Sequence, residues 1–134
     1  MKKLSLMGDL SKNFSKLEFM CPCSCGADKI STVLIKKLQK VRNIIGRPIV
    51  ITSGVRCEFH NTSIKASMNS SHVPDDFGIG HAVDIACLNS IDRYELVEVA
   101  QKFFKRIGIS GGSYGGFVHS DVDRSKIQEV IWLY

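Results

Sequence analysis

Two short segments of the chain alternate between apolar and polar side chains, and each carries a potential metal ligand on one face. In residues 82–86, Asp84 lies between two small alanines on one face of an expected strand, and two β-branched residues occupy the other face. In residues 117–122, the same period places His119 and Asp121 together. Pairing of the two strands would set Asp84 and His119 side by side. We therefore expect a sheet whose one face is apolar and whose other face carries a polar site.

A third potential metal ligand, His72, lies in a Ser-rich loop shortly before the first of these segments. Two imidazoles and one carboxylate form a protein ligand set for zinc that leaves a fourth position open for water, as in catalytic sites, whereas structural sites usually have four ligands. Each residue alone is equally well explained as an ordinary core or surface residue. The three contexts together favour a zinc site built from His72, Asp84 and His119, and hence a hydrolase.

The order of these motifs resembles the zinc D-alanyl-D-alanine carboxypeptidase superfamily. That superfamily includes VanY-like and VanX-like peptidases, phage L-alanyl-D-glutamate endolysins and the zinc-bearing amino-terminal domain of hedgehog proteins. The similarity covers nearly the whole chain and rests on these stretches: Leu10–Cys21, Ile51–Arg56 with His60-Asn61, Ser70-x-His72, Gly80-x-Ala82-x-Asp84 and Phe117-Val118-His119-x-Asp121.

The resemblance implies a zinc peptidase that acts on peptidoglycan stem peptides. It implies that Arg56 binds the substrate or stabilises a developing oxyanion, and that Ser70 and Asn61 belong to the substrate site. D-Ala-D-Ala carboxypeptidase activity is the favoured expectation. The alternatives are an L-Ala-D-Glu endopeptidase of the phage endolysin type, and an inactive zinc-bearing protein that binds the cell wall or belongs to a virion.

The chain departs from the superfamily pattern at two places. Seven residues, 73–79, separate His72 from Gly80 where two are usual, so we expect a loop extension beside the site, whose acids Asp75 and Asp76 are candidates for substrate binding. Several branches carry an acidic general base three residues before the last zinc histidine, and Gly116 occupies that position here. The nearest replacements are two residues that carry a carboxylate or an imidazole: Asp121 and His81.

The remaining pattern predicts one α+β domain over residues 1–134, with helices flanking a mainly antiparallel sheet that carries the zinc site. For the second helix, over 91–107, the sequence does not decide whether Ser90 caps the first turn or Asp92 and Glu95 form a capping box. The expected elements are a helix over 31–45, a strand over 49–52, a second helix over 91–107, a glycine-rich turn over 111–116 and a last strand over 129–134.

Charge and hydropathy restrict the classes of partner that we expect the chain to bind. A net charge of +5 favours an anionic partner, but no dense basic tract occurs and only 8% of the residues are aromatic, so we expect no nucleic-acid binding. No segment has the roughly 20 apolar residues of a membrane span, and Gly8-Asp9 interrupts the first apolar run before a signal sequence forms. We expect synthesis in the cytosol and action at the cell wall after release, as for a phage lysis protein; a mature fragment and a virion component are the alternatives.

Five cysteines are present, and three of them, Cys21, Cys23 and Cys25, alternate within five residues. A structural zinc held by this group and Cys57 is one interpretation. We do not favour it, because a strand through the three would point the middle thiol away from the other two. An odd count in a cytosolic chain indicates that at least some thiols are free, and Cys87 is expected to pack as a small apolar residue.

Overall fold

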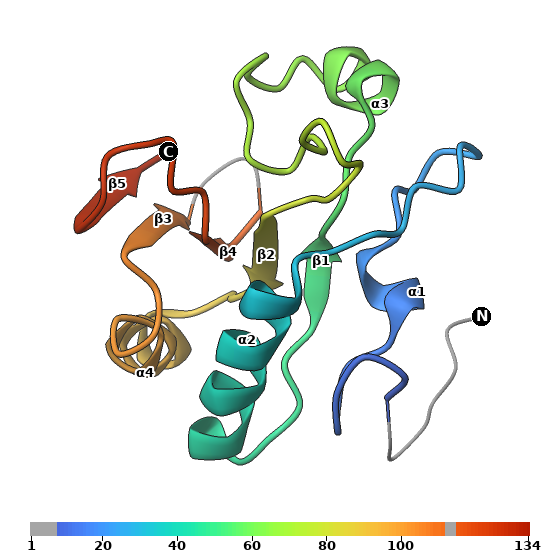
Figure 1. Cartoon of the computed structure of the whole chain (residues 1–134). Coiled ribbons are helices and arrows are strands. Elements are labelled where there is room, and N and C mark those ends of the chain that lie inside the picture. Colours follow the sequence, from blue (N-terminus) through green and yellow to red (C-terminus); the bar gives the residue numbers. More distant parts are fainter. Residues whose placement is uncertain (1–7, 112–114) are drawn as a thin grey trace.

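A computed structural model describes residues 8–111 and 115–134 and shows a layer of helices on a five-stranded sheet (Figure 1). Residues 112–114 of the expected glycine-rich turn lie outside the described residues. The helices are α1 Lys16–Phe19, α2 Thr32–Ile45, α3 Glu58–Ser63 and α4 Ser90–Ala100, and the strands are β1 Ile51–Ser53, β2 Ala82–Ala86, β3 Arg106–Ser110, β4 Phe117–Asp121 and β5 Val130–Leu133.

The sheet has the strand order β1-β2-β4-β3-β5. Neighbouring strands are antiparallel from β1 through β3, and only the outer pair β3/β5 is parallel. The expected α+β class with a mostly antiparallel sheet is confirmed. The strand expected over 49–52 begins later, at Ile51. Val50 is exposed, although its carbonyl accepts a hydrogen bond from the Ala86 amide of β2.

The helix expected over 31–45 is α2, which lies in front of the sheet in Figure 1. Ser31 caps its first turn by accepting a hydrogen bond from the Leu34 amide, and Gly46 ends it at φ 74°, a conformation that glycine adopts without strain. Its buried residues are Leu34, Ile35, Leu38 and Val41. Ile35 is buried, whereas Val33 is half exposed.

The helix expected over 91–107 ends early. α4 stops at Ala100, a turn follows, and residues 106–110 form strand β3 between β4 and β5. Ile107, the last residue of the expected helix, reaches the core from a strand instead, because β3 gains hydrogen-bonding partners on both sides. The residue that caps this helix is neither Ser90 nor an Asp92/Glu95 capping box. It is Asn89, whose side chain accepts a hydrogen bond from the Asp92 amide.

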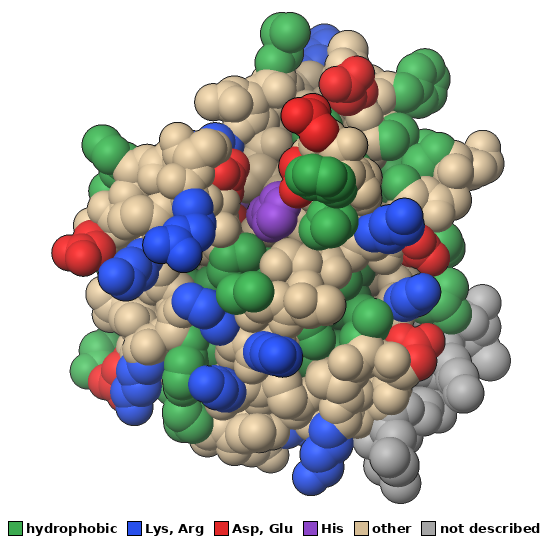
Figure 2. Space-filling view, in the orientation of Figure 1, with side chains coloured by type: hydrophobic (Ala, Val, Ile, Leu, Met, Phe, Trp, Pro, Cys, Tyr) green, Lys and Arg blue, Asp and Glu red, His purple; other side chains and the backbone are tan. Residues whose placement is uncertain are grey.

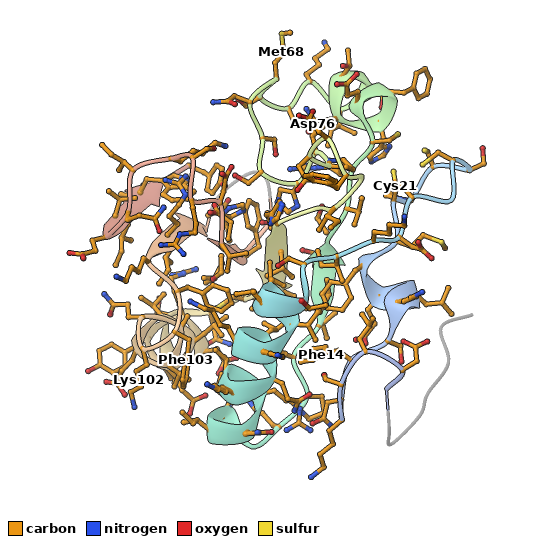
Figure 3. All side chains as sticks on the ribbon, viewed as in Figure 1. Phe14, Cys21, Met68, Asp76, Lys102 and Phe103 are labelled. Carbon is orange, nitrogen blue, oxygen red and sulfur yellow. The ribbon has the colours of Figure 1, made fainter. Side chains whose placement is uncertain are left out.

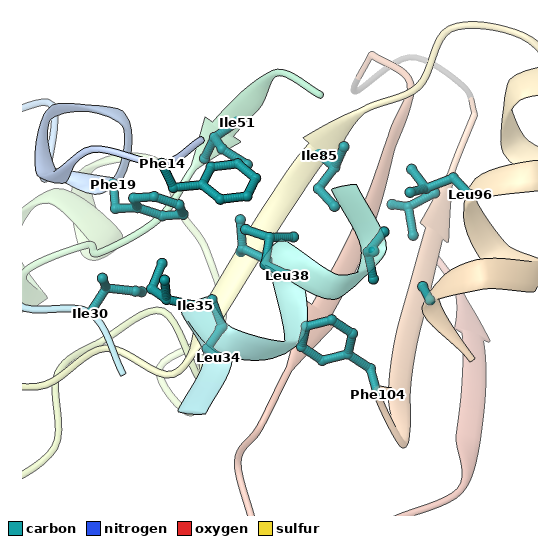
Figure 4. Packing of buried hydrophobic residues seen from close by; sticks show 14 of the residues in the cluster. Phe14, Phe19, Ile30, Leu34, Ile35, Leu38, Ile51, Ile85, Leu96 and Phe104 are labelled. Atoms are coloured by element: carbon teal, nitrogen blue, oxygen red, sulfur yellow. The ribbon is translucent and has the colours of Figure 1, made fainter. Parts of the chain in front are cut away.

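The apolar core fills the space between the helices and one face of the sheet (Figure 4). Leu34 and Leu38 of α2 pack there with Ile85 of β2, and Phe14 and Phe19 close the side next to β1. Because side chains alternate along a strand, the opposite face of β2 and β4 presents Ala82, Asp84, Ala86, Phe117, His119 and Asp121. The sheet therefore separates a dry core from a polar face.

Lysine and arginine side chains are dispersed over the face that carries α2 rather than gathered in one patch (Figure 2). Among residues 8–111 and 115–134, no helix combines the length and the apolar character that crossing a bilayer requires.

Candidate active site

The pairing of β2 with β4 brings two of the three expected ligands together. Asp84 lies opposite His119 in the antiparallel register, as the alternating pattern predicted. Both side chains project from the polar face, yet both are buried. The long segment between α3 and β2 covers this face and delivers His72, which is also buried.

His72 is held in place by backbone atoms of the turn after β1. Its Nδ1 lies 2.6 Å from the Gly54 carbonyl oxygen, and its own carbonyl accepts from the Arg56 amide at 3.0 Å. Position 54 requires glycine, because a Cβ there would lie 2.6 Å from the Phe19 Cα. The close passage of the Phe19 and Gly54 backbones thus fixes the Gly54 carbonyl, and this carbonyl holds the ring of His72.

Three donor atoms converge on one point. His72 Nε2 lies 3.2 Å from both Asp84 Oδ1 and His119 Nδ1, and His119 Nδ1 lies 2.9 Å from the same Asp84 oxygen. The outer partners assign the tautomers, since the Gly54 carbonyl and the Asp121 carboxylate can only accept. Each imidazole then carries its proton on the outer nitrogen and presents a lone pair inward. Lone pairs this close repel one another unless a cation or a proton lies between them.

The donor set fits zinc. Zinc–nitrogen and zinc–oxygen bonds of about 2.0–2.2 Å separate tetrahedral ligands by roughly 3.3–3.5 Å. The distances of 2.9–3.2 Å between the three donor atoms are slightly shorter. The remaining side of the triad opens to a cleft of about 770 Å³.

Electrostatics favour the protonation states that a cation requires in two of the three groups. Burial opposes the ionisation of Asp84, yet contacts with His119 and His72 hold the pKa of its carboxyl well below the ordinary value. Burial lowers the pKa of His72. Burial also acts to lower the pKa of His119, but its contacts with Asp121 and Asp84 outweigh this and raise it. A metal ion therefore competes with a proton for the inner nitrogen of His119.

Asp121, expected as a general base, contacts the outer nitrogen of His119 instead of facing the open side of the triad. Its Oδ2 accepts from His119 Nε2 at 2.8 Å and its Oδ1 accepts from Arg106 Nε at 2.9 Å. The carboxylate is fully buried. This geometry suits a group that orients a metal ligand and not one that takes a proton from a substrate-side water.

His81, the other candidate base, lies apart from the triad. Its Nε2 contacts the Asp75 carboxylate at 2.8 Å, and the ring lines a separate depression near Lys37. Asp75 also accepts from the amides of Phe77 and Ile79, so it organises the 73–79 loop extension. His81 therefore serves this loop in the structure, and the exposed Asp76 lies further out on it (Figure 3).

The glycine at position 116 is a steric requirement. A Cβ there would lie 2.0 Å from the Cys87 carbonyl oxygen, and the two backbones are joined by a hydrogen bond from the Cys87 amide to the Gly116 carbonyl. An acidic side chain cannot occupy this position in the present backbone.

The three expected substrate residues occupy different places. Arg56 lines the cleft, and its Nη2 donates to Ser70 Oγ at 3.2 Å. Ser70 also accepts from the His72 amide, so it links the guanidinium to the metal-site loop. Asn61 is buried outside the cleft lining, where its amide donates to the Ser67 carbonyl and fastens α3 to the following loop.

Sequence reasoning missed an aromatic and basic wall contributed by β3 and β5. The Trp132 ring centroid lies 5.3 Å from that of His119, and the Arg106 guanidinium lies 4.8 Å from the centre of the Trp132 ring. Gly108 makes room, because a Cβ there would lie 2.7 Å from both Trp132 and Tyr134. The alternation of residues 130–134 places Trp132 and Tyr134 on one face and was the available signal.

Two histidines and a carboxylate that converge over the polar face of an α+β sheet, open to a cleft, define a metallohydrolase type of site. The family model described as Peptidase M15 matches residues 12–121, which include all three convergent residues. No curated protein matches the chain. The chain therefore belongs to the Peptidase M15 family of zinc-dependent metallopeptidases, as the motif order predicted.

Proposed function

We propose that the protein is a zinc carboxypeptidase that removes the terminal D-Ala from peptidoglycan stem peptides at the cell wall. Membership of Peptidase M15 supports a metallopeptidase. The observation that carries the finer proposal is Arg56, a cation in the cleft of the metal site with an unmatched hydrogen-bonding group.

Arg56 has the features of a carboxylate receptor. Among the described residues, no acidic side chain forms an ion pair with it, and its Nε is buried without a hydrogen-bonding partner. Burial lowers the pKa of the guanidinium, although a nearby Asp84 favours the charged form. A partly buried cation without an anionic partner is costly, and a substrate carboxylate would satisfy it through two parallel hydrogen bonds. The C-terminal carboxylate of a stem peptide is such a group.

The remaining charge of the cleft favours an anionic peptide. Four basic side chains and two acidic ones line it, and the acidic ones, Asp84 and Asp121, are both engaged with histidines. Stem peptides carry several carboxylates, so this balance attracts them. The basic side chains are Arg56, Lys65, Arg106 and Lys126.

We assign the triad His72, Asp84 and His119 to zinc binding. When bound there, zinc polarises a carbonyl and lowers the pKa of a water in its open position towards ~7. Asp121 holds the Nε2 proton of His119 and so keeps Nδ1 available, while Arg106 holds Asp121.

Tyr134 acts as a hydrogen-bond donor in this scheme. Burial raises the pKa of its phenol to about 12, so the hydroxyl stays protonated at neutral pH. It lines the cleft beside Trp132, where a protonated phenol can donate to a substrate carbonyl or a developing oxyanion. It cannot serve as the base.

The test compares peptides ending in D-Ala-D-Ala as free acid and as C-terminal amide. The expected result is zinc-dependent release of D-Ala from the free acid only, and a large fall in kcat/KM for Arg56→Lys, which keeps the charge but loses the fork of donors. Arg124→Lys is the matched control, because Arg124 is exposed and does not line this cleft. Equal cleavage of both peptides would contradict the carboxylate role and favour an L-Ala-D-Glu endopeptidase.

A further inference from the structure

Four of the five cysteines gather at a place that the peptidase site does not use. Cys21, Cys23 and Cys25 lie on the loop after α1, and Cys57 precedes α3 more than thirty positions later. Figure 3 shows Cys21 on this loop, beside the segment that leads from β1 to α3. The four sulfur atoms all lie within 4.8 Å of one another.

The expectation that the middle thiol points away is wrong, because the segment is not a strand. Residues 22–25 form bends and a turn. The Cys21 amide donates to the Ala27 carbonyl at 2.8 Å, and Gly26 takes φ 80° to close the loop. Cys23 is thereby turned inward, so that its sulfur lies 3.5 Å from both Cys21 and Cys57.

The spacing of the sulfurs matches one tetrahedral ion. Zinc–sulfur bonds of about 2.3 Å place tetrahedral sulfurs roughly 3.8 Å apart. The separations here are 3.5 Å for Cys21–Cys23, 3.8 Å for Cys21–Cys57 and 3.5 Å for Cys23–Cys57. Disulfide formation would instead draw two sulfurs to about 2.05 Å and leave the others apart.

Backbone amides point at three of the sulfurs. The Cys57 amide donates to Cys21, the His60 amide to Cys57 and the Ala27 amide to Cys25, at 3.4–3.5 Å. A neutral thiol is a weak acceptor, whereas a thiolate accepts strongly. Converging thiolates repel one another unless a cation lies between them.

We propose that Cys21, Cys23, Cys25 and Cys57 hold a structural zinc ion. Four thiolates close the coordination shell, so this site has no position for water and differs in kind from the His/Asp/His centre. The inference does not depend on peptidase activity.

The ion would tie the N-terminal loop to the turn that positions the active site. Cys57 directly follows Arg56, and the Val55 amide donates to the Phe19 carbonyl at 2.8 Å. The same turn supplies the Gly54 carbonyl that orients His72. Loss of the ion is therefore expected to loosen His72 and Arg56 without removing a ligand from the active site.

Zinc content per chain tests the proposal on the full-length protein, purified under reducing conditions and passed through a chelator wash. Wild type should retain about two zinc ions, and Cys25→Ala/Cys57→Ala should retain about one. Cys87→Ala is the matched control and should keep both, because the Cys87 sulfur faces the Asn89 carbonyl instead of the cluster. Equal zinc content in wild type and the double variant would overturn the proposal.

A second measurement covers the case in which the double variant does not fold. Titration of folded wild type with a mercurial thiol reagent should release one zinc ion, and cobalt substituted for that ion should show a thiolate-to-cobalt charge-transfer band. Release of no zinc, iron in place of zinc, or a mass deficit from disulfides in protein purified without reductant would contradict the assignment. His119→Ala should still release this zinc ion, which separates failure here from failure of the peptidase proposal.

Discussion

Replacement of Asp121 by asparagine separates an orienting role from a base role. Oδ2 of Asp121 accepts a hydrogen bond from His119 Nε2, and Oδ1 accepts from Arg106 Nε and from the Asp123 amide. Asparagine has one oxygen and one NH₂ group, so in either orientation its NH₂ group faces the N–H of His119 or that of Arg106. The Arg106 side chain is only 11% exposed and loses its neutralising charge.

The magnitude follows from these contacts. Removal of one partner from a buried ion pair costs about 3–5 kcal/mol. An unfolding entropy of about 2.1 cal/mol/K per residue gives ~0.28 kcal/mol/K for 134 residues, so a loss of ~3 kcal/mol lowers the Tm of the metal-free protein by about 11 °C. Loss of the orienting hydrogen bond should weaken zinc binding by about 10- to 100-fold.

Calorimetry of the metal-free protein and competition with a chromogenic zinc chelator measure the two effects. Asp76→Asn removes the same charge from the exposed loop and should change neither. At saturating zinc, Asp121→Asn should cleave within about tenfold of wild type. Full zinc loading with hydrolysis reduced to background would refute the orienting role and restore Asp121 as the base.

Three further results are expected. Gly116→Ala should fold poorly or lose activity, as measured by thermal melting and peptide cleavage, because its Cβ would lie 2.0 Å from the Cys87 carbonyl oxygen; a wild-type Tm would contradict this. In absorbance titration, Tyr134 should ionise at about 12. Because the folded state favours the protonated phenol, its stabilising contribution is present below the ordinary pKa of 10.0 and should be lost as the pH rises from 10.0 to about 12. Tyr134→Phe should remove the ionisation at about 12 from the titration. His81→Ala should keep zinc content and cleavage near wild type, since its ring pairs with Asp75; a large loss of cleavage would return His81 to the active site.

The positions of Asp84 and His119 could be predicted because strand alternation and pairing are regular. Two segments with period two and one apolar face leave few registers that keep both polar faces together, and the observed one aligns these residues. The fold class followed from the same regularity.

Arg106 could not be found in this way, because Ile107 satisfies a helical stripe as well as a strand. Only the tertiary pairing of β3 with β4 and β5 decides between them. The contact between Asp121 and the outer nitrogen of His119 could not be predicted for a related reason. Alternation places Asp121 on the face of His119, but only the ring orientation shows which nitrogen it contacts.

The cysteine cluster shows a further limit. A local strand through Cys21 and Cys25 would separate their thiols from that of Cys23, and the turn closed at Gly26 brings them together. Contact with Cys57 arises from the close passage of Phe19 and Gly54, which no local pattern in the sequence reveals.

The most direct test of the active-site assignment is a crystal structure with anomalous diffraction data collected at the zinc absorption edge. We expect an anomalous peak bonded to His72 through Nε2, to Asp84 through Oδ1 and to His119 through Nδ1, with its open side towards the cleft that contains Arg56. Zinc-loaded crystals without a peak among these three atoms would contradict the account, and so would coordination of His119 through Nε2.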